Sequence, residues 1–166
     1  MISIINLSQR VHGINDRICD VLQKGLAARN VGFRYITTRD LTIRPCTNCR
    51  SCMQSPGEEL GTCPMSDGMG ELVRSILDSR CVIVSAPINC YDLPSIMRVL
   101  LERMSIFCYW PDESYSPVIR VMQRSIKGIL ITTSALPGIM VPLVTRSRKT
   151  FKLFAKPLKM TRIDYH

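Results

Sequence analysis

The sequence predicts a single α/β domain in which a parallel sheet has helices on both faces. Short apolar runs suited to strands alternate five times with segments whose apolar residues recur at helical spacing. The clearest run, Cys81–Pro87, is almost continuously apolar, as expected of a strand that is buried on both faces. A chain of 166 residues is long enough to bury a sizeable core within one domain.

The first half of the chain shows this alternation. Ile2–Leu7 is a nearly continuous apolar run and predicts the first strand. Apolar residues recur at helical spacing from Asn15 to Asn30, and Gly32 follows as a stop signal. Phe33–Thr38 predicts the second strand, and the amphipathic pattern of Asp67–Ser79 predicts the second helix.

The second half continues the same pattern after the strand at Cys81–Pro87. Apolar residues mark one face of a helix from about Ser95 to Met104. Gly128–Thr133 predicts the fourth strand, and a basic helix is expected near Leu143–Phe154. Leu158–Tyr165 can supply the fifth strand.

The net charge of +9 is concentrated late in the chain. Residues 1–116 hold twelve basic and twelve acidic side chains, whereas residues 117–166 hold ten basic side chains and one acidic, Asp164. We interpret the basic stretch first as a solvated helix face and second as a docking surface. No nucleic-acid motif accompanies it and only 6% of the residues are aromatic, which argues against nucleic acid as a partner.

Hydropathy and cysteine content bear on the location of the protein. No apolar run approaches the roughly 20 residues of a membrane helix. The opening residues read as a strand rather than as a signal peptide. We therefore expect no membrane association and a cytoplasmic location, where eight cysteines are expected as thiols or metal ligands rather than disulfides.

Ligands of open parallel sheets bind beyond the carboxyl ends of the strands, which directs attention to residues 8–15, 87–94 and 132–138. In the first of these loops, the start of a helix aims backbone amides at an anion. Ser8 and Asn15 can add hydrogen bonds, and Arg10 can add a charged one. An ordinary strand-to-helix turn is the alternative interpretation.

The same three loops carry a resemblance to a known family. Residues 7–15, Leu-Ser-Gln-Arg-Val-His-Gly-Ile-Asn, resemble the phosphate loop Gly-Ser-x-Arg-x-x-Ser-x-Asn of the flavodoxin-like NAD(P)H-dependent FMN reductases and their iron–sulfur flavoprotein branch. Residues 85–94 are similar to the family's Ser-Pro-x-Tyr loop, with Asn89 in place of the aromatic residue and Tyr91 nearby. Residues 132–138 lack the glycine pair that is frequent in the family.

The resemblance implies a flavodoxin-like three-layer sandwich over residues 1–166, with strand order 2-1-3-4-5. It also implies bound FMN, with NAD(P)H as the electron donor. The implied phosphate-binding residues are Ser8, Arg10, Gly13 and Asn15; those beside the flavin ring are Pro87, Ile88, Asn89, Cys90 and Tyr91; those at its far edge are Thr133, Ser134, Ala135 and Leu136.

A cysteine-rich loop spans about residues 45–66. Its cysteines, Cys46, Cys49, Cys52 and Cys63, can place four thiolates around one point. Three interpretations stay open: a [4Fe–4S] cluster as in the iron–sulfur branch, structural zinc, or free thiols that pack as small apolar groups.

The resulting hypothesis is an FMN-dependent NAD(P)H oxidoreductase that passes electrons to a quinone, a flavin or another small acceptor. We expect the protein to form a homodimer or a homotetramer. One alternative is a [4Fe–4S] iron–sulfur flavoprotein that exchanges electrons with a redox protein. A second alternative is a non-enzymatic metal-binding or interaction module that has lost FMN, which the departures at Leu7, Asn89 and residues 132–138 motivate.

Overall fold

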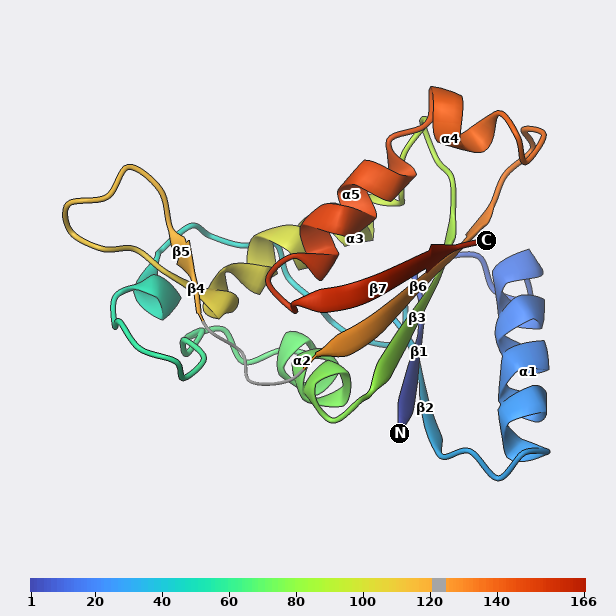
Figure 1. Cartoon of the computed structure of the whole chain (residues 1–166), viewed down its shortest axis with the longest axis horizontal. Helices are drawn as coiled ribbons and strands as arrows, with labels where there is room; N and C mark the ends of the chain where they lie inside the picture. Colours follow the sequence, from blue (N-terminus) through green and yellow to red (C-terminus); the bar gives the residue numbers. More distant parts are fainter. Residues whose placement is uncertain (121–124) are drawn as a thin grey trace.

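The structure is a computed structural model, which describes residues 1–120 and 125–166 apart from the side chain of Arg162. Its central sheet has five parallel strands in the order β2-β1-β3-β6-β7 (Figure 1). The predicted order 2-1-3-4-5 is confirmed, because β6 and β7 are the fourth and fifth strands of this sheet. The strands are β1 (Ile2–Asn6), β2 (Phe33–Thr37), β3 (Cys81–Pro87), β6 (Ile126–Thr133) and β7 (Met160–Tyr165).

Helices lie on both faces of the sheet. Within the described residues, α1 lies alone on one face, and α2, α3 and α5 cover the other (Figure 1). The larger core lies on the second face and includes Leu72, Leu100 and Phe151, whereas a smaller cluster around Ile4 and Cys19 lies under α1. The helices are α1 (Ile14–Ala27), α2 (Met69–Leu77), α3 (Ser95–Arg103), α4 (Val141–Val144) and α5 (Ser147–Ala155).

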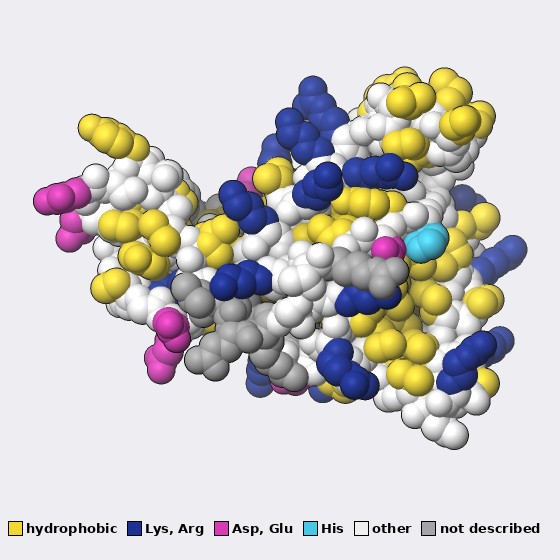
Figure 2. All heavy atoms as spheres, in the orientation of Figure 1, with side chains coloured by type: hydrophobic (Ala, Val, Ile, Leu, Met, Phe, Trp, Pro, Cys, Tyr) yellow, Lys and Arg dark blue, Asp and Glu magenta, His cyan; other side chains and the backbone are white. Residues whose placement is uncertain are grey.

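The two faces of the sheet are covered unequally. Ile129 and Ile131 of β6 pack against the cluster under α1 but are only partly buried. Figure 2 shows apolar atoms at the surface between β7 and α1, where no helix of the described chain covers the sheet. No helix among the described residues has the length and hydropathy needed to cross a membrane.

The basic helix predicted near residues 143–154 is in fact two helices, α4 and α5. Thr145 interrupts them with an extended backbone, at φ −112° and ψ 156°. The amide of Arg146 donates to the carbonyl oxygen of Tyr91 at 2.8 Å instead of continuing a helical ladder. This contact with a loop distant in sequence ends α4 and gave no signal in the local pattern.

A small lobe extends from the sheet domain on the side of α2 and α3 (Figure 1). We define the cysteine lobe as residues 45–66 and 104–120. It contains the short helices η1 (Ser51–Met53) and η2 (Met104–Phe107) and the antiparallel pair of β4 (Cys108–Tyr109) and β5 (Val118–Ile119). Backbone hydrogen bonds join its two segments, from Trp110 to Met53 at 2.9 Å and from Gly61 to Ile106 at 2.8 Å. The cysteine loop was predicted from the sequence, but the β4–β5 pair against which it packs was not.

Candidate functional site

Side-chain hydrogen bonds bring the three predicted ligand loops together at Asn15. Its amide nitrogen donates to the hydroxyl of Thr133 at 2.9 Å, and its amide oxygen accepts from the hydroxyl of Ser85 at 2.9 Å. The amide of Ile88 donates to the carbonyl oxygen of Thr133 at 2.8 Å. The first turn of α1 and the ends of β3 and β6 therefore form one surface at the carboxyl edge of the sheet.

The loop before α1 is shaped to receive an anion through its backbone. No side chain caps α1, so the amides of its first turn, which have no intrahelical partner, are available. The buried Ser8 turns its hydroxyl inward and accepts from the amide of Arg10 at 3.3 Å. Gly13 is the N-cap residue, and the Arg10 side chain is exposed. These features fit the phosphate of FMN, with the backbone amides as its principal donors.

Arg39 supports this loop and was missed by the sequence analysis. Its guanidinium donates to the carbonyl oxygens of Ser8 at 3.3 Å and Arg10 at 3.4 Å, and pairs with Asp16 at 2.9 Å. Burial alone would raise the pKa of the Asp16 carboxyl, but the hydrogen bond and charge of Arg39 lower it overall. An arginine that reaches a loop 29 residues away leaves no local pattern to detect.

The loop after β3 is a tight two-residue turn. Asn89 and Asp92 exchange backbone hydrogen bonds of 2.8 and 3.0 Å, while Cys90 and Tyr91 have φ values of 49° and 63°. Two positive φ values in such a turn match type I′, which favours Asn and Gly. Cys90 and Tyr91 are therefore strained, and the side chain of Tyr91 is 65% exposed.

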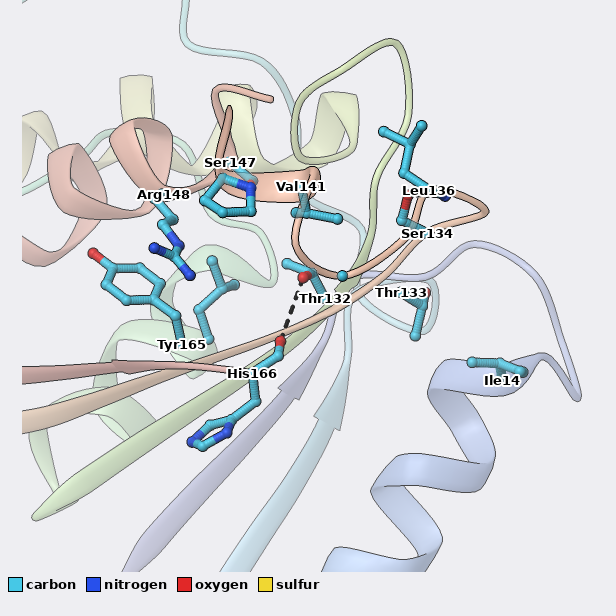
Figure 3. A pocket seen from close by; sticks show the side chains of 13 residues that line it. Ile14, Thr132, Thr133, Ser134, Leu136, Val141, Ser147, Arg148, Tyr165 and His166 are labelled. Carbon is cyan, nitrogen blue, oxygen red and sulfur yellow. Dashed lines mark hydrogen bonds between the residues drawn. The ribbon is translucent and has the colours of Figure 1, made fainter. Parts of the chain in front are cut away.

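The loop after β6 lines a cavity of about 330 Å³. Thr133, Ser134 and Leu136, three of the residues implied to lie at the far edge of the flavin, face this cavity (Figure 3). Arg148 of α5 lies 4.8 Å from the ring centre of Tyr165 on the opposite wall. The remaining residues of the predicted flavin site lie outside this cavity; they are Ser8, Arg10, Gly13, Asn15, Pro87, Ile88, Asn89, Cys90, Tyr91 and Ala135.

The four cysteines of the predicted metal site surround one small cavity. Cys46, Cys49, Cys52 and Cys63 all line a space of about 30 Å³ in the cysteine lobe. Burial raises the pKa of the Cys52 thiol, and the three neighbouring thiols add to that shift. In the part of the chain that the structure describes, no three Cys, His, Asp or Glu side chains are arranged as an assembled metal site. The donor set therefore fits a four-thiolate group in kind, and the four cysteines line one cavity without being assembled as a metal site.

Two buried arginines flank this cysteine cavity, and each is 3% exposed. Arg103 donates to the sulfur of Cys63 at 3.7 Å and forms a bidentate pair with Asp67 at 2.6 and 3.0 Å. The hydrogen bonds from Arg103 lower the pKa of the Asp67 carboxyl to about 2. Arg120 donates to the carbonyl oxygens of Cys52 at 3.3 Å, Ser55 at 2.9 Å and Gly57 at 3.0 Å.

Solved structures share this fold. A flavone reductase superposes with a TM-score of 0.64 at 15% identity, over 99% of this chain and 51% of the other. The NAD(P)H:quinone oxidoreductase from Methanothermobacter marburgensis gives a TM-score of 0.73 at 10% identity, over 99% and 84%. Smu.1420 from Streptococcus mutans gives 0.73 at 14% identity, over 99% and 85%. At these identities the likeness shows the fold, which is flavodoxin-like as predicted.

Sequence comparison identifies the family. An iron-sulfur flavoprotein of Archaeoglobus fulgidus is 25% identical over 104 residues, which are 63% of this chain and 45% of that protein. The match thus spans less than half the length of that curated relative. The family model described as NADPH-dependent FMN reductase matches residues 1–126. The chain belongs to the NADPH-dependent FMN reductase family.

Proposed function

We propose that this protein is an FMN-dependent oxidoreductase that takes electrons from NADPH and passes them to a small acceptor such as a quinone or a flavin. The observation that carries this proposal is the joining of the three loops at Asn15, directly beside the uncapped start of α1. Membership of the NADPH-dependent FMN reductase family supports the same activity.

The chain's own residues would divide the binding of FMN among the three loops. The amides at the start of α1 would bind the phosphate, and Arg39 would keep that loop in place through the carbonyls of Ser8 and Arg10. The turn at Cys90–Tyr91 and the strand end at Thr133 would border the ring. Bound FMN supplies the hydride chemistry, while the protein supplies orientation and electrostatics.

The test is reconstitution of the purified chain with FMN, followed by desalting and an absorption spectrum. We expect retained FMN in about a one-to-one ratio and bleaching of the flavin by NADPH under anaerobic conditions. Colourless protein after desalting would contradict the proposal and favour the non-enzymatic alternative. Retained flavin that NADPH does not reduce would leave FMN binding intact and exclude this donor.

A second proposal concerns the cysteine lobe, where a four-thiolate cluster would exchange electrons with FMN or a redox protein. Its support is the cavity shared by the four cysteines and the similarity to a protein named iron-sulfur flavoprotein. Quantification of iron, sulfide and zinc in anaerobically purified protein tests this proposal. About four irons per chain would support the cluster, one zinc would support a structural site, and neither would leave the thiols free.

Assembly into a homodimer or homotetramer also stays a proposal. Its support is the exposed apolar surface around α4, where Ile139 and Leu143 are each 80% exposed. Sedimentation of the FMN-loaded protein would measure its oligomeric state directly. A monomer at micromolar concentration would contradict the proposed assembly.

A further inference from the structure

A single guanidinium contacts both ends of the cysteine loop. Arg103 lies at the end of α3, outside that loop, and its side chain is buried. One of its terminal nitrogens donates to the carbonyl oxygen of Arg44, two residues before Cys46, at 2.9 Å. The other donates to the sulfur of Cys63, the last of the four cysteines, at 3.7 Å. The loop between these points has both ends fixed to the same side chain.

Asp67 fixes the orientation of this guanidinium. Its carboxylate accepts from both terminal nitrogens of Arg103 and also from the amides of Arg44 at 3.0 Å and Met69 at 3.1 Å. The planar fork of arginine suits this bidentate geometry, which a lysine cannot reproduce. Arg103 and Asp67 therefore hold Arg44, which precedes the first cysteine, and Met69, which follows the last one, in a fixed relation.

Arg120 binds the middle of the same loop from the other side. Its guanidinium donates to three backbone carbonyls between Cys52 and Gly57, and its Nε is buried with no hydrogen-bond partner. No carboxylate within the described residues pairs with it. A buried cation without an anionic partner is unfavourable. Its contacts with the carbonyl oxygens of Cys52, Ser55 and Gly57 place this positive charge beside the segment that carries Cys52.

We propose that Arg103 and Arg120 are positioning residues that hold the cysteine loop in shape and offset the negative charge of a four-thiolate centre. Arg103 sets the place of Cys63 relative to Cys46, and Arg120 sets the place of Cys52. This inference rests on the proposed metal-binding role of the four cysteines. It adds two residues, both outside the cysteine motif, on which that role depends.

The expected effects follow from the chemistry of thiolate ligands. Hydrogen bonds and positive charge near the sulfurs tune the potential of an iron–sulfur centre, and both favour the reduced, more negative form. Loss of a residue that hydrogen-bonds to a metal ligand lowers metal affinity by about 10–100-fold. Removal of either guanidinium should therefore weaken metal binding and lower the reduction potential of an iron-loaded centre.

The test uses Co²⁺ as the probe on the full chain reconstituted with FMN after reduction and removal of bound metal. Thiolate-to-cobalt absorption reports binding, and titration gives the dissociation constant for the unchanged protein, Arg103→Gln, Arg103→Lys and Arg120→Gln. We expect about 10–100-fold weaker binding for the two Gln variants. For Arg103→Lys we expect only partial recovery, because lysine retains the charge without the fork. Arg98→Gln, an exposed position on the same helix, is the matched control and should bind Co²⁺ normally.

The outcomes distinguish the positioning role of the two arginines from the metal-binding role of the four cysteines. Normal Co²⁺ affinity in folded Arg103→Gln and Arg120→Gln would overturn the inference. No thiolate-to-cobalt absorption in the unchanged protein would overturn both the inference and the metal-binding role, whereas retained FMN and NADPH oxidation in that sample would keep the reductase proposal. If one Gln variant does not fold, the other decides, since Arg103 and Arg120 act on different segments of the loop.

Discussion

Asn15 and Thr133 lie 118 positions apart in the sequence, and their side chains are joined by a hydrogen bond of 2.9 Å. Because the same Asn15 amide also accepts from Ser85, the start of α1 is coupled to the ends of β3 and β6. The loop that would bind phosphate and the loops that would border the flavin ring are therefore positioned by one buried side chain.

Asn15→Ala should weaken both the fold and FMN binding. It leaves the hydroxyls of Ser85 and Thr133 without their shared partner, which we expect to lower the free energy of unfolding by about 1–3 kcal/mol. FMN affinity should fall as well, because the three loops lose their common contact. Urea unfolding and fluorescence titration with FMN measure the two effects. Gln23→Ala on the same helix is the control, and equal effects in both variants would contradict a specific role for Asn15.

Gly61→Ala should disrupt the cysteine lobe without preventing the folding of the sheet. A Cβ atom at Gly61 would overlap the carbonyl oxygen of Cys52. Such overpacking costs about 1–3 kcal/mol, and it should displace the segment that carries Cys52. Gly70→Ala is the matched control, because a Cβ there meets nothing within 4 Å. Thermal unfolding and Co²⁺ titration of both variants check this, and normal metal binding by Gly61→Ala would contradict it.

Stability should fall in acid as Asp67 loses its charge. The pKa of Asp67 is about 2 in the folded protein, against 3.8 unperturbed, so its ionised form contributes about 2 kcal/mol. This contribution is complete above about pH 5 and is lost as the pH falls towards 2, because the unfolded chain binds the proton first. The free energy of unfolding, measured with urea at pH 5 and at about pH 2.5, should fall less between these pH values for Asp67→Asn than for the unchanged protein. Asp78 is exposed, so Asp78→Asn should lose as much unfolding free energy in acid as the unchanged protein does.

Tyr91→Gly should stabilise the fold and weaken FMN binding. Glycine relieves the positive φ of 63° at this position, and such strain costs about 1–3 kcal/mol. The same change removes the exposed ring that would border the flavin. The melting temperature of the FMN-free protein should therefore rise, while the affinity for FMN measured by titration should fall. Unchanged FMN affinity would show that Tyr91 makes no contact with the flavin.

Much of the fold could be predicted because each buried strand is visible in its own segment of the sequence as a run of apolar residues. Cys81–Pro87 and Ile2–Asn6 are apolar runs, and their pairing with β2 and β6 follows the order implied by the family resemblance. The break between α4 and α5 could not be predicted, because it depends on a bond from Arg146 to the distant Tyr91. Local periodicity carries no information about such a contact.

The candidate site likewise contains parts that could be predicted from local sequence and parts that depend on contacts between distant residues. The sequence identified the three loops and the four cysteines, and the structure brings each group together. The sequence did not identify Arg39 or Arg120. These arginines donate to backbone carbonyls that are 29 to 68 residues away, and every residue type has such a carbonyl. An acceptor of this kind leaves no trace in the sequence, so the partner of a buried arginine is visible only in three dimensions.

The division of the cysteine lobe into two segments has a consequence for the order of events during synthesis. The four cysteines of the loop have emerged by residue 63, whereas Arg103 comes only at the end of α3, after α2 and β3, and Trp110 and Arg120 follow it. The nascent chain therefore presents its thiols before the residues that hold them exist. A metal bound at that stage would meet a loose loop, and the proposed four-thiolate centre would become rigid only after the sheet has formed and the later segment has docked.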